Sequence, residues 1–176
     1  MAALQRLNLS GPAMVFITTT VQHWTPVFAD ERLARIMTEQ LRETLERNAV
    51  SACAYVVMPS HFHALLGFPE VEQLSKVVRA IKSLSARRIQ PMLSVKQKSA
   101  FCESGQFLFW KRRFDDLVVC SEKQFIVKAE YIHNNPVKTE LVERPTDYKY
   151  SSASDWLLDR PGVIPIDRSW KWQDRP

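Results

Sequence analysis

The sequence predicts an α+β fold: a ferredoxin-like two-layer sandwich with helices on one face of an antiparallel sheet, plus a C-terminal helix that bears a tyrosine. Two observations support this prediction. The expected elements follow one another as strand, helix, hairpin, helix and strand, which is the order of such a sandwich. Residues 61–68 also alternate in character, so their apolar side chains would form one stripe against the helices. That stripe consists of Phe62, Ala64, Leu66 and Phe68.

The first half of the chain should contain a strand, a helix and a hairpin. Residues 14–21 are rich in β-branched and aromatic side chains, which favours a strand. A helix is expected from Asp30, a suitable N-cap, to about Asn48, because its apolar residues keep helical spacing. Strands at 52–58 and 61–68 are joined by a tight Pro-Ser turn, so we expect them to form an antiparallel hairpin.

A second amphipathic helix and two short strand-like segments should follow. The helix covers residues 74–90, and Pro91 would end it. Residues 92–105 are polar and show no regular pattern. Residues 107–110 and 117–119 are again rich in aromatic and β-branched side chains, and they would add strand structure to the sheet.

A third helix is expected near the end of the folded region. It would begin at Ser121, because Ser-Glu-Lys-Gln fits a capping box. It would end near Asn134, since Asn135 precedes Pro136 and the residue before a proline is disfavoured in the α-helical conformation.

Length and composition indicate one ordinary soluble domain. The chain has 176 residues, of which 45% are hydrophobic and 24% are charged. We expect a flexible N-terminus over residues 1–13, a functional domain over 14–153 and an irregular C-terminal tail over 154–176. No signal peptide is apparent, and the longest apolar run, residues 52–58, is too short to span a membrane. A cytoplasmic protein with no membrane partner is therefore expected.

Basic residues are concentrated in one part of the chain. The formal net charge is +5, yet residues 74–113 contain ten Lys or Arg and a single acidic residue, Glu103. Such a block is typical of a surface that binds a polyanion, most simply nucleic acid. The alternative is a solvated helix face with no partner. The residues expected to contact DNA are Lys76, Arg79, Lys82, Arg87, Arg88, Lys111, Arg112 and Arg113.

Two histidines make a metal site conceivable. His61 and His63 lie two residues apart on an expected strand, so both side chains would point to the face opposite the apolar stripe. Imidazole is a common metal ligand, but two polar residues on a sheet surface would show the same pattern. A third ligand would be needed to decide between these interpretations.

The third helix offers a nucleophile and a further polar group. Tyr131 and Asn135 are four residues apart, so they would lie on one helix face, whereas His133 would face elsewhere. A tyrosine phenolate can attack a phosphodiester, and a divalent ion can polarise the phosphoryl oxygens. A tyrosine with its hydroxyl in water would have the same sequence signature.

Several short motifs, taken together, resemble the single-tyrosine HUH transposases, and specifically the REP-associated tyrosine transposases of bacteria. The resemblance covers about residues 14–153. The motifs that carry it are Val-Met-Pro-Ser-His-Phe-His at 57–63, Trp-Lys-Arg-Arg-Phe-Asp-Asp at 110–116, Tyr-Ile-His-Asn-Asn-Pro-Val-Lys at 131–138 and Asp-Tyr-Lys-Tyr-Ser-Ser at 147–152.

The resemblance implies an IS200-like domain that cuts and rejoins single-stranded DNA near a hairpin, through a covalent 5′-phosphotyrosine. Tyr131 would be the nucleophile, His61 and His63 would bind Mg²⁺ or Mn²⁺, and Asn135 would be the third ligand. The partner would be hairpin DNA of repetitive extragenic palindromes, in a nucleoid-associated protein that works as a homodimer or a monomer. The basic residues would follow the phosphates, and unpaired bases would stack on Trp110, Phe114, Trp170 or Trp172.

Two departures from the family pattern and two other functions remain open. Glu140 replaces a common glycine, and Leu117 stands where the family often has a histidine, which leaves the DNA contacts at those turns undecided. A non-catalytic nucleic-acid-binding module would use the basic surface without a metal. A metal-dependent phosphoesterase would use the two histidines to activate water instead of a tyrosine.

Overall fold

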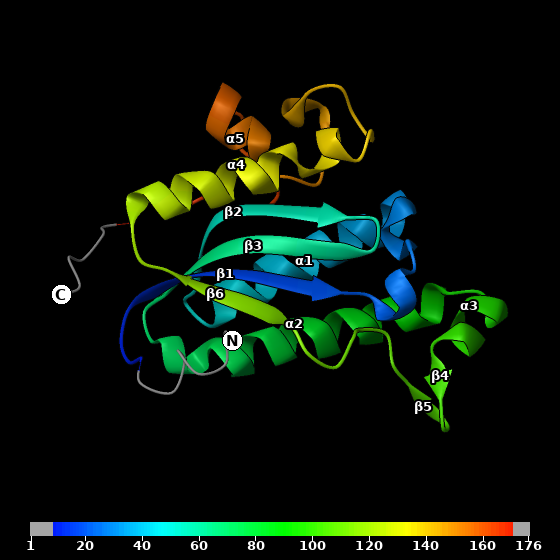
Figure 1. The fold of residues 1–176 in the computed structure, drawn as a ribbon. Coiled ribbons are helices and arrows are strands. Elements are labelled where there is room, and N and C mark those ends of the chain that lie inside the picture. Colours follow the sequence, from blue (N-terminus) through cyan, green and yellow to red (C-terminus); the bar gives the residue numbers. More distant parts are fainter. Residues whose placement is uncertain (1–8, 171–176) are drawn as a thin grey trace.

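The computed structural model describes residues 9–170, whose centre is a four-stranded antiparallel sheet (Figure 1). Its strands are β1 (Ala13–Thr20), β2 (Ser51–Met58), β3 (His61–Phe68) and β6 (Asp115–Val119), in the spatial order β2-β3-β1-β6. This order and the sequence of elements confirm the predicted ferredoxin-like fold class. β1 and β3, which lie in the middle of the sheet, are therefore held by neighbours on both sides.

Helices cover both faces of this sheet. α1 (Glu31–Arg47) and α2 (Leu74–Ile89) pack on one face, where they enclose the larger hydrophobic core. α4 (Glu122–Lys138) packs against β2 and β3 on the other face, as Figure 1 shows. The sheet face opposite α1 and α2, which the two-layer prediction left without helices, is thus partly covered by the tyrosine-bearing helix itself. No helix within residues 9–170 is both long and apolar enough to cross a bilayer.

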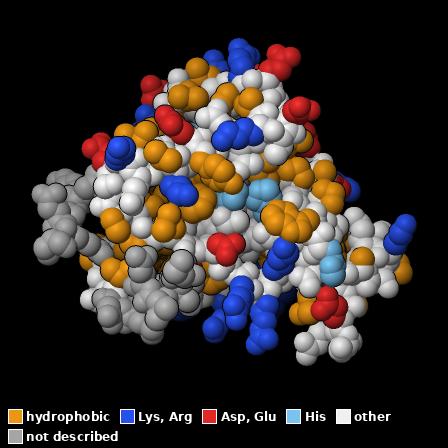
Figure 2. Space-filling view, in the orientation of Figure 1, with side chains coloured by type: hydrophobic (Ala, Val, Ile, Leu, Met, Phe, Trp, Pro, Cys, Tyr) orange, Lys and Arg blue, Asp and Glu red, His pale blue; other side chains and the backbone are white. Residues whose placement is uncertain are grey.

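The register of the β2–β3 hairpin determines where the histidines point. Met58 pairs with His61 across the two-residue turn, as predicted. Phe62, Ala64 and the rest of the apolar stripe belong to the core beneath α1 and α2. Because side chains alternate along a strand, His61 and His63 project to the α4 side. Figure 2 shows histidine surface near the centre of that side of the molecule.

The predicted end of the third helix is wrong. α4 continues to Lys138 and contains Pro136 within its last turn, and it begins after the Ser121 cap as predicted. Proline cannot donate the usual helical hydrogen bond, but it is buried here together with Asn135, and burial of apolar surface opposes that loss. The Thr139 amide still donates to the Asn135 carbonyl, so the helix closes regularly beyond the proline.

The segment between α2 and β6 also differs from the prediction. Residues 92–105 contain a short helix, α3 (Val95–Ala100), with a complete capping box between Ser94 and Gln97. A small hairpin follows, formed by β4 (Cys102–Glu103) and β5 (Gln106–Phe107), so the predicted strand over 107–110 does not join the main sheet as a strand. Trp110 instead makes an isolated bridge to Val21, the residue that follows β1. β6 in turn begins two residues earlier than expected.

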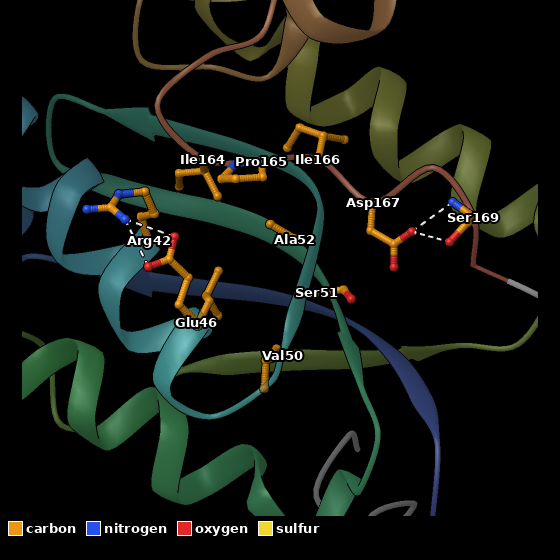
Figure 3. Close-up of a pocket in the computed structure, with 11 residues that line it drawn as sticks. Arg42, Glu46, Val50, Ser51, Ala52, Ile164, Pro165, Ile166, Asp167 and Ser169 are labelled. Carbon is orange, nitrogen blue, oxygen red and sulfur yellow. Dashed lines mark hydrogen bonds and ion pairs between the residues drawn. The ribbon is translucent and has the colours of Figure 1, made fainter.

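The C-terminal region is more ordered than the predicted irregular tail. α5 (Ala153–Leu158) is helical, and residues 164–167 then run beside the edge strand β2. Ile166 bridges to Ala52, whose carbonyl accepts a hydrogen bond from the Asp167 amide. Figure 3 shows this segment over β2. A cavity of about 350 Å³ lies between it and the end of α1. Unpaired backbone groups at the sheet edge provide the reason for this order.

Ser152 connects α4 to β2, and we expect its loss to destabilise the fold. Its hydroxyl accepts a hydrogen bond from the Tyr55 amide and lies 2.9 Å from His133 Nε2. Ser152→Ala would leave both buried groups without this partner, which should lower the free energy of unfolding by about 2 kcal/mol. Chemical denaturation measures the change. The exposed Ser99→Ala is the control, and equal stability of the two variants would contradict the prediction.

Candidate active site

The two histidines of β3 lie side by side at the edge of α4. Their ring centroids are 4.7 Å apart, and the planes are nearly perpendicular. His63 is buried, and its ring stacks at 5.5 Å on that of Phe16 from the neighbouring strand. His61 is partly exposed at the end of β3, next to the turn. The strand therefore presents one imidazole inside the site and one at its mouth.

Hydroxyl groups hold one nitrogen of each ring. Thr18 Oγ1 lies 2.7 Å from His63 Nδ1, and Ser60 Oγ lies 3.2 Å from His61 Nδ1. These contacts leave the Nε2 atoms for a metal, since a hydroxyl oxygen can accept from a protonated Nδ1. Thr18 carries no recognisable motif in the sequence. Its position follows from the register, because Thr18 pairs directly with His63.

The surroundings of the histidines favour neutral imidazoles. Burial lowers the pKa of His61 to about 4. Burial, together with the nearby His61 and the Lys128 ammonium, lowers the pKa of His63 to about 3. Desolvation disfavours a charged imidazolium, so both rings are uncharged at neutral pH. A neutral imidazole is the form that binds metal ions.

Tyr131 projects from α4 toward this pair. Its hydroxyl lies 3.5 Å from His63 Nε2, although 68 residues separate the two in sequence. The ring also meets that of Phe16 edge to face at 6.0 Å. The side chain remains 39% exposed, so one side of it contacts the site and the other is open to a substrate. The Tyr131 hydroxyl is thus accessible and lies next to a histidine nitrogen.

The other polar residues of α4 divide between two faces. Asn135 is one helical turn beyond Tyr131 and is 8% exposed. His133 is buried and turns away toward Ser152, as the sequence predicted. In the described part of the chain, no group of three His, Cys, Asp or Glu side chains could hold a metal ion. The role of Asn135 as a third metal ligand therefore stays a prediction.

Two lysines of α4 flank the tyrosine. Lys138 Nζ lies 5.6 Å from the centroid of the Tyr131 ring, and Lys128 Nζ lies 5.9 Å from it. Lys128 is also 4.7 Å from the Phe16 ring, so it stands over the floor of the site. Both lysines lie outside the basic block of residues 74–113 and were not predicted to contact DNA. Helical spacing from Tyr131 could have identified them, at three and seven positions.

The predicted DNA-contacting cations are not equivalent in the structure. Arg88 makes two hydrogen bonds to Glu43, which join α2 to α1. Lys82 donates to the carbonyls of Lys111 and Arg112, and burial lowers the pKa of its ammonium. These two side chains hold the fold together. Arg88 is nonetheless exposed, as are Lys76, Arg79, Arg87, Arg112 and Arg113.

Three of these basic residues surround a second hollow. A cavity of about 380 Å³ separates α2 from the segment that precedes β6, with an aromatic floor. The Arg79, Lys82 and Arg112 side chains line it.

The aromatic residues suggested for base stacking are mostly structural. Trp110 is buried, and its indole nitrogen donates to Ser85 Oγ at 3.0 Å. Phe114 is partly buried and packs against the main core. The Trp170 ring lies against Gly67, where an added Cβ would come within 2.6 Å of it. Trp172 lies outside the described residues.

A ferredoxin-like sheet whose His-x-His strand faces a tyrosine-bearing helix defines the single-tyrosine HUH class of proteins. The chain belongs to the family of IS200-like transposases, whose sequence profile matches residues 13–135. The family resemblance stated from the motifs is therefore confirmed. The match ends at Asn135, so it includes the histidine pair and Tyr131.

Individual relatives agree with this assignment. A Haemophilus influenzae protein, provisionally named as a REP-associated tyrosine transposase, is 25% identical over 150 residues, which cover 84% of this chain and 83% of that protein. A solved structure of a REP-associated tyrosine transposase bound to a REP hairpin superposes with a TM-score of 0.70 and 20% identity, over 97% of this chain and 92% of that one. The solved structure of a provisionally assigned transposase from Deinococcus radiodurans superposes with a TM-score of 0.52 and 24% identity, over 72% of this chain and 93% of that one.

The buried histidines predict a loss of stability in mild acid. Burial lowers the pKa of His133 to about 4, and the pKa values of His61 and His63 are also low. Their unfolded values are near 6.5. Below that pH the unfolded chain binds more protons than the folded one, so stability falls between about pH 6.5 and 4, by up to ~1.4 kcal/mol per pH unit for each histidine.

Denaturation with EDTA at a series of pH values tests this expectation. His133→Asn should reduce the pH dependence of the free energy of unfolding by the contribution of one histidine. The stability of this variant at neutral pH serves as its reference. A free energy of unfolding that does not change between pH 7 and 5 would contradict the prediction.

Proposed function

We propose that this transposase-family protein cuts and rejoins single-stranded DNA beside a hairpin, with Tyr131 as the nucleophile. The observation that carries the proposal is the approach of the Tyr131 hydroxyl to His63 Nε2, at 3.5 Å, in a partly open site. A tyrosine with a purely structural role would not require the buried, neutral imidazole of His63 next to its hydroxyl.

The proposed reaction exchanges one phosphodiester for another. Tyr131 Oη, having lost its proton, attacks the phosphorus of the scissile bond. The bond between phosphorus and the 3′-oxygen breaks, the departing oxygen takes up a proton from water to become a 3′-hydroxyl, and the 5′-phosphate remains on the tyrosine. A free 3′-hydroxyl can later attack this phosphotyrosine and release Tyr131, so rejoining needs no nucleotide cofactor. Lys128 and Lys138, on either side of the tyrosine ring, would pair with the charge of the phosphate.

A divalent ion, Mg²⁺ or Mn²⁺, is the cofactor of this proposal. The residues fit such an ion, because two neutral imidazoles have their Nδ1 atoms held by hydroxyls and an amide lies one turn from the nucleophile. His61 and His63 would hold it, with Asn135 as the third ligand. When bound, the ion would stabilise the negative charge that develops on the phosphoryl oxygens.

The substrate is proposed to be the hairpin of a repetitive extragenic palindrome with an unpaired flank. The REP-associated transposase of known structure was solved with a REP hairpin, and it matches almost the whole of this chain in fold. The exposed Lys76, Arg79 and Arg112 would contact backbone phosphates of such DNA. A homodimer and a monomer are both compatible with a site built from β3 and α4 of one chain.

The test is incubation with hairpin DNA from the source genome's repeats, in Mn²⁺ or in EDTA, followed by a denaturing gel. A protein–DNA adduct that forms only with metal is the expected result. Specific binding without any adduct would refute the enzyme proposal and favour a binding module. Cleavage that releases free 5′-phosphate without an adduct would instead favour a phosphoesterase that activates water.

A further inference from the structure

A single exposed tryptophan stands at the entrance to the histidine pair. Trp24 is 56% exposed, the most accessible aromatic side chain among the described residues. Its ring meets that of His61 nearly edge to face, with centroids 5.6 Å apart and planes at 74°. A lone exposed apolar ring is common on protein surfaces, so the case for Trp24 depends on its contact with His61 and on its backbone.

The backbone that carries the Trp24 ring is strained. His23 has φ 57° and Trp24 has φ 55°, both in the left-handed region that bulky residues avoid. Two consecutive residues of this kind persist only where the surrounding structure imposes them, and such strain is concentrated at functional sites.

Main-chain hydrogen bonds hold this loop on both sides. The Val21 amide donates to the Ser60 carbonyl, directly before His61, and the Gln22 amide donates to the Phe109 carbonyl. The Lys111 amide in turn donates to the Thr20 carbonyl at 2.8 Å. The loop therefore keeps Trp24 at a constant place relative to the histidine strand. Little conformational freedom would remain to be lost when a ligand binds there.

A cation accompanies the ring. Lys111 Nζ lies 4.4 Å from the centroid of Trp24, a cation–π contact that brings a positive charge beside the exposed indole. Arg88 pairs with Glu43, whereas Lys111 takes part in no ion pair within residues 9–170. An exposed aromatic ring with an ammonium group over it offers partners for the two parts of a nucleotide, a base and a phosphate.

We infer that Trp24 is a stacking platform for an unpaired base of the DNA strand beside the scissile phosphate, and that Lys111 binds the phosphate of that nucleotide. This inference rests on the proposed function and extends it to the positioning of the strand. The Trp24 ring meets His61 and the Tyr131 ring meets His63, so the stack would orient the strand at the His61 end of the site. Trp24 was not among the residues predicted from the sequence to contact DNA.

Fluorescence of 2-aminopurine tests the stack without cleavage. The full chain with Tyr131→Phe binds a hairpin oligonucleotide in which each flanking base is replaced in turn by 2-aminopurine. At one or two adjacent flank positions, the 2-aminopurine emission should be quenched when residue 24 is tryptophan or phenylalanine. It should be restored in Trp24→Leu. All three side chains meet the same backbone strain, and only leucine lacks a ring. Affinity should fall about tenfold or more in Trp24→Leu, as stacking energies for single bases indicate.

The salt dependence of binding tests the lysine. Lys111→Met keeps the aliphatic stem and removes the charge. The slope of log K against log salt should become shallower by about 0.7, the value for one phosphate contact in single-stranded DNA. Arg160→Met, after α5, changes the net charge equally and should leave the slope unchanged. Identical slopes for the two variants would overturn the role of Lys111.

Two results would overturn the role of Trp24. The first is emission that is the same for tryptophan, phenylalanine and leucine at every flank position. The second is a loss of metal binding in Trp24→Leu without DNA, which would make the ring a cover for His61 instead. Failure of the proposed function looks different: the wild-type protein would form no adduct, while the dependence of the 2-aminopurine signal on residue 24 persisted.

Discussion

Tyr131→Phe should abolish the covalent protein–DNA adduct and lower strand cleavage by at least about a thousandfold, because the reacting oxygen is removed. The phenyl ring that remains still fits the contacts with Phe16, Lys128 and Lys138. Binding of hairpin DNA should therefore stay within a few-fold of the wild-type affinity. A denaturing gel measures the adduct, and a filter-binding or anisotropy titration measures the affinity.

Tyr148→Phe is the matched control for this experiment. Its hydroxyl donates to the Val57 carbonyl at 2.9 Å and lies away from the histidine pair. The substitution removes the same atom as Tyr131→Phe, so it should cost stability but leave adduct formation intact. If Tyr131→Phe still formed the adduct, another nucleophile would be responsible. If it cleaved without an adduct at the wild-type rate, water would be the nucleophile.

His61→Ala and His63→Ala should each remove metal-dependent cleavage, by at least about a hundredfold, because two of the three proposed ligands are neutral imidazoles. Metal binding can be measured without DNA. With the ion at a hundred times its dissociation constant, the wild-type protein should gain about 2.7 kcal/mol of stability. Each variant should lose most of this gain, which thermal unfolding in Mn²⁺ and in EDTA detects.

A third histidine supplies the control for metal binding. His23→Asn alters an exposed imidazole outside the pair, and asparagine tolerates the left-handed backbone found there. This variant should keep the metal-induced stabilisation. His63→Ala should in addition disturb Tyr131, whose hydroxyl faces that ring. Equal stabilisation by metal in wild type, His61→Ala and His63→Ala would show that the ion binds elsewhere.

Local patterns were sufficient to predict most secondary structure. The alternation of residues 61–68 indicated both the strand and the opposite placement of its histidines, because side-chain direction depends only on position along the strand. The Ser121 cap was equally readable. The prediction failed at Pro136, where burial outweighs the local preference of the residue before a proline, and at α3, whose Ser94–Gln97 capping box was overlooked.

The candidate site was only partly predictable. Strand and helix spacing singled out the histidine pair, Tyr131 and Asn135, and resemblance to the family supplied their roles. The structure places the tyrosine hydroxyl next to His63. Thr18, Lys128 and Trp24 carried no motif of their own. Each gains its position through a neighbour distant in sequence: a paired strand, a facing helix or a loop hydrogen-bonded to Ser60.

The sequence by itself determined the element order, the fold class, the family and the face on which His61 and His63 lie. These properties follow from spacings of a few residues and from motifs that occupy contiguous segments. Only the tertiary structure decided that Lys82 and Arg88 brace the fold, that Tyr131 meets His63, and that Trp24 stands beside His61. Such contacts join residues from different elements, so they depend on strand register and helix packing, which no local pattern specifies.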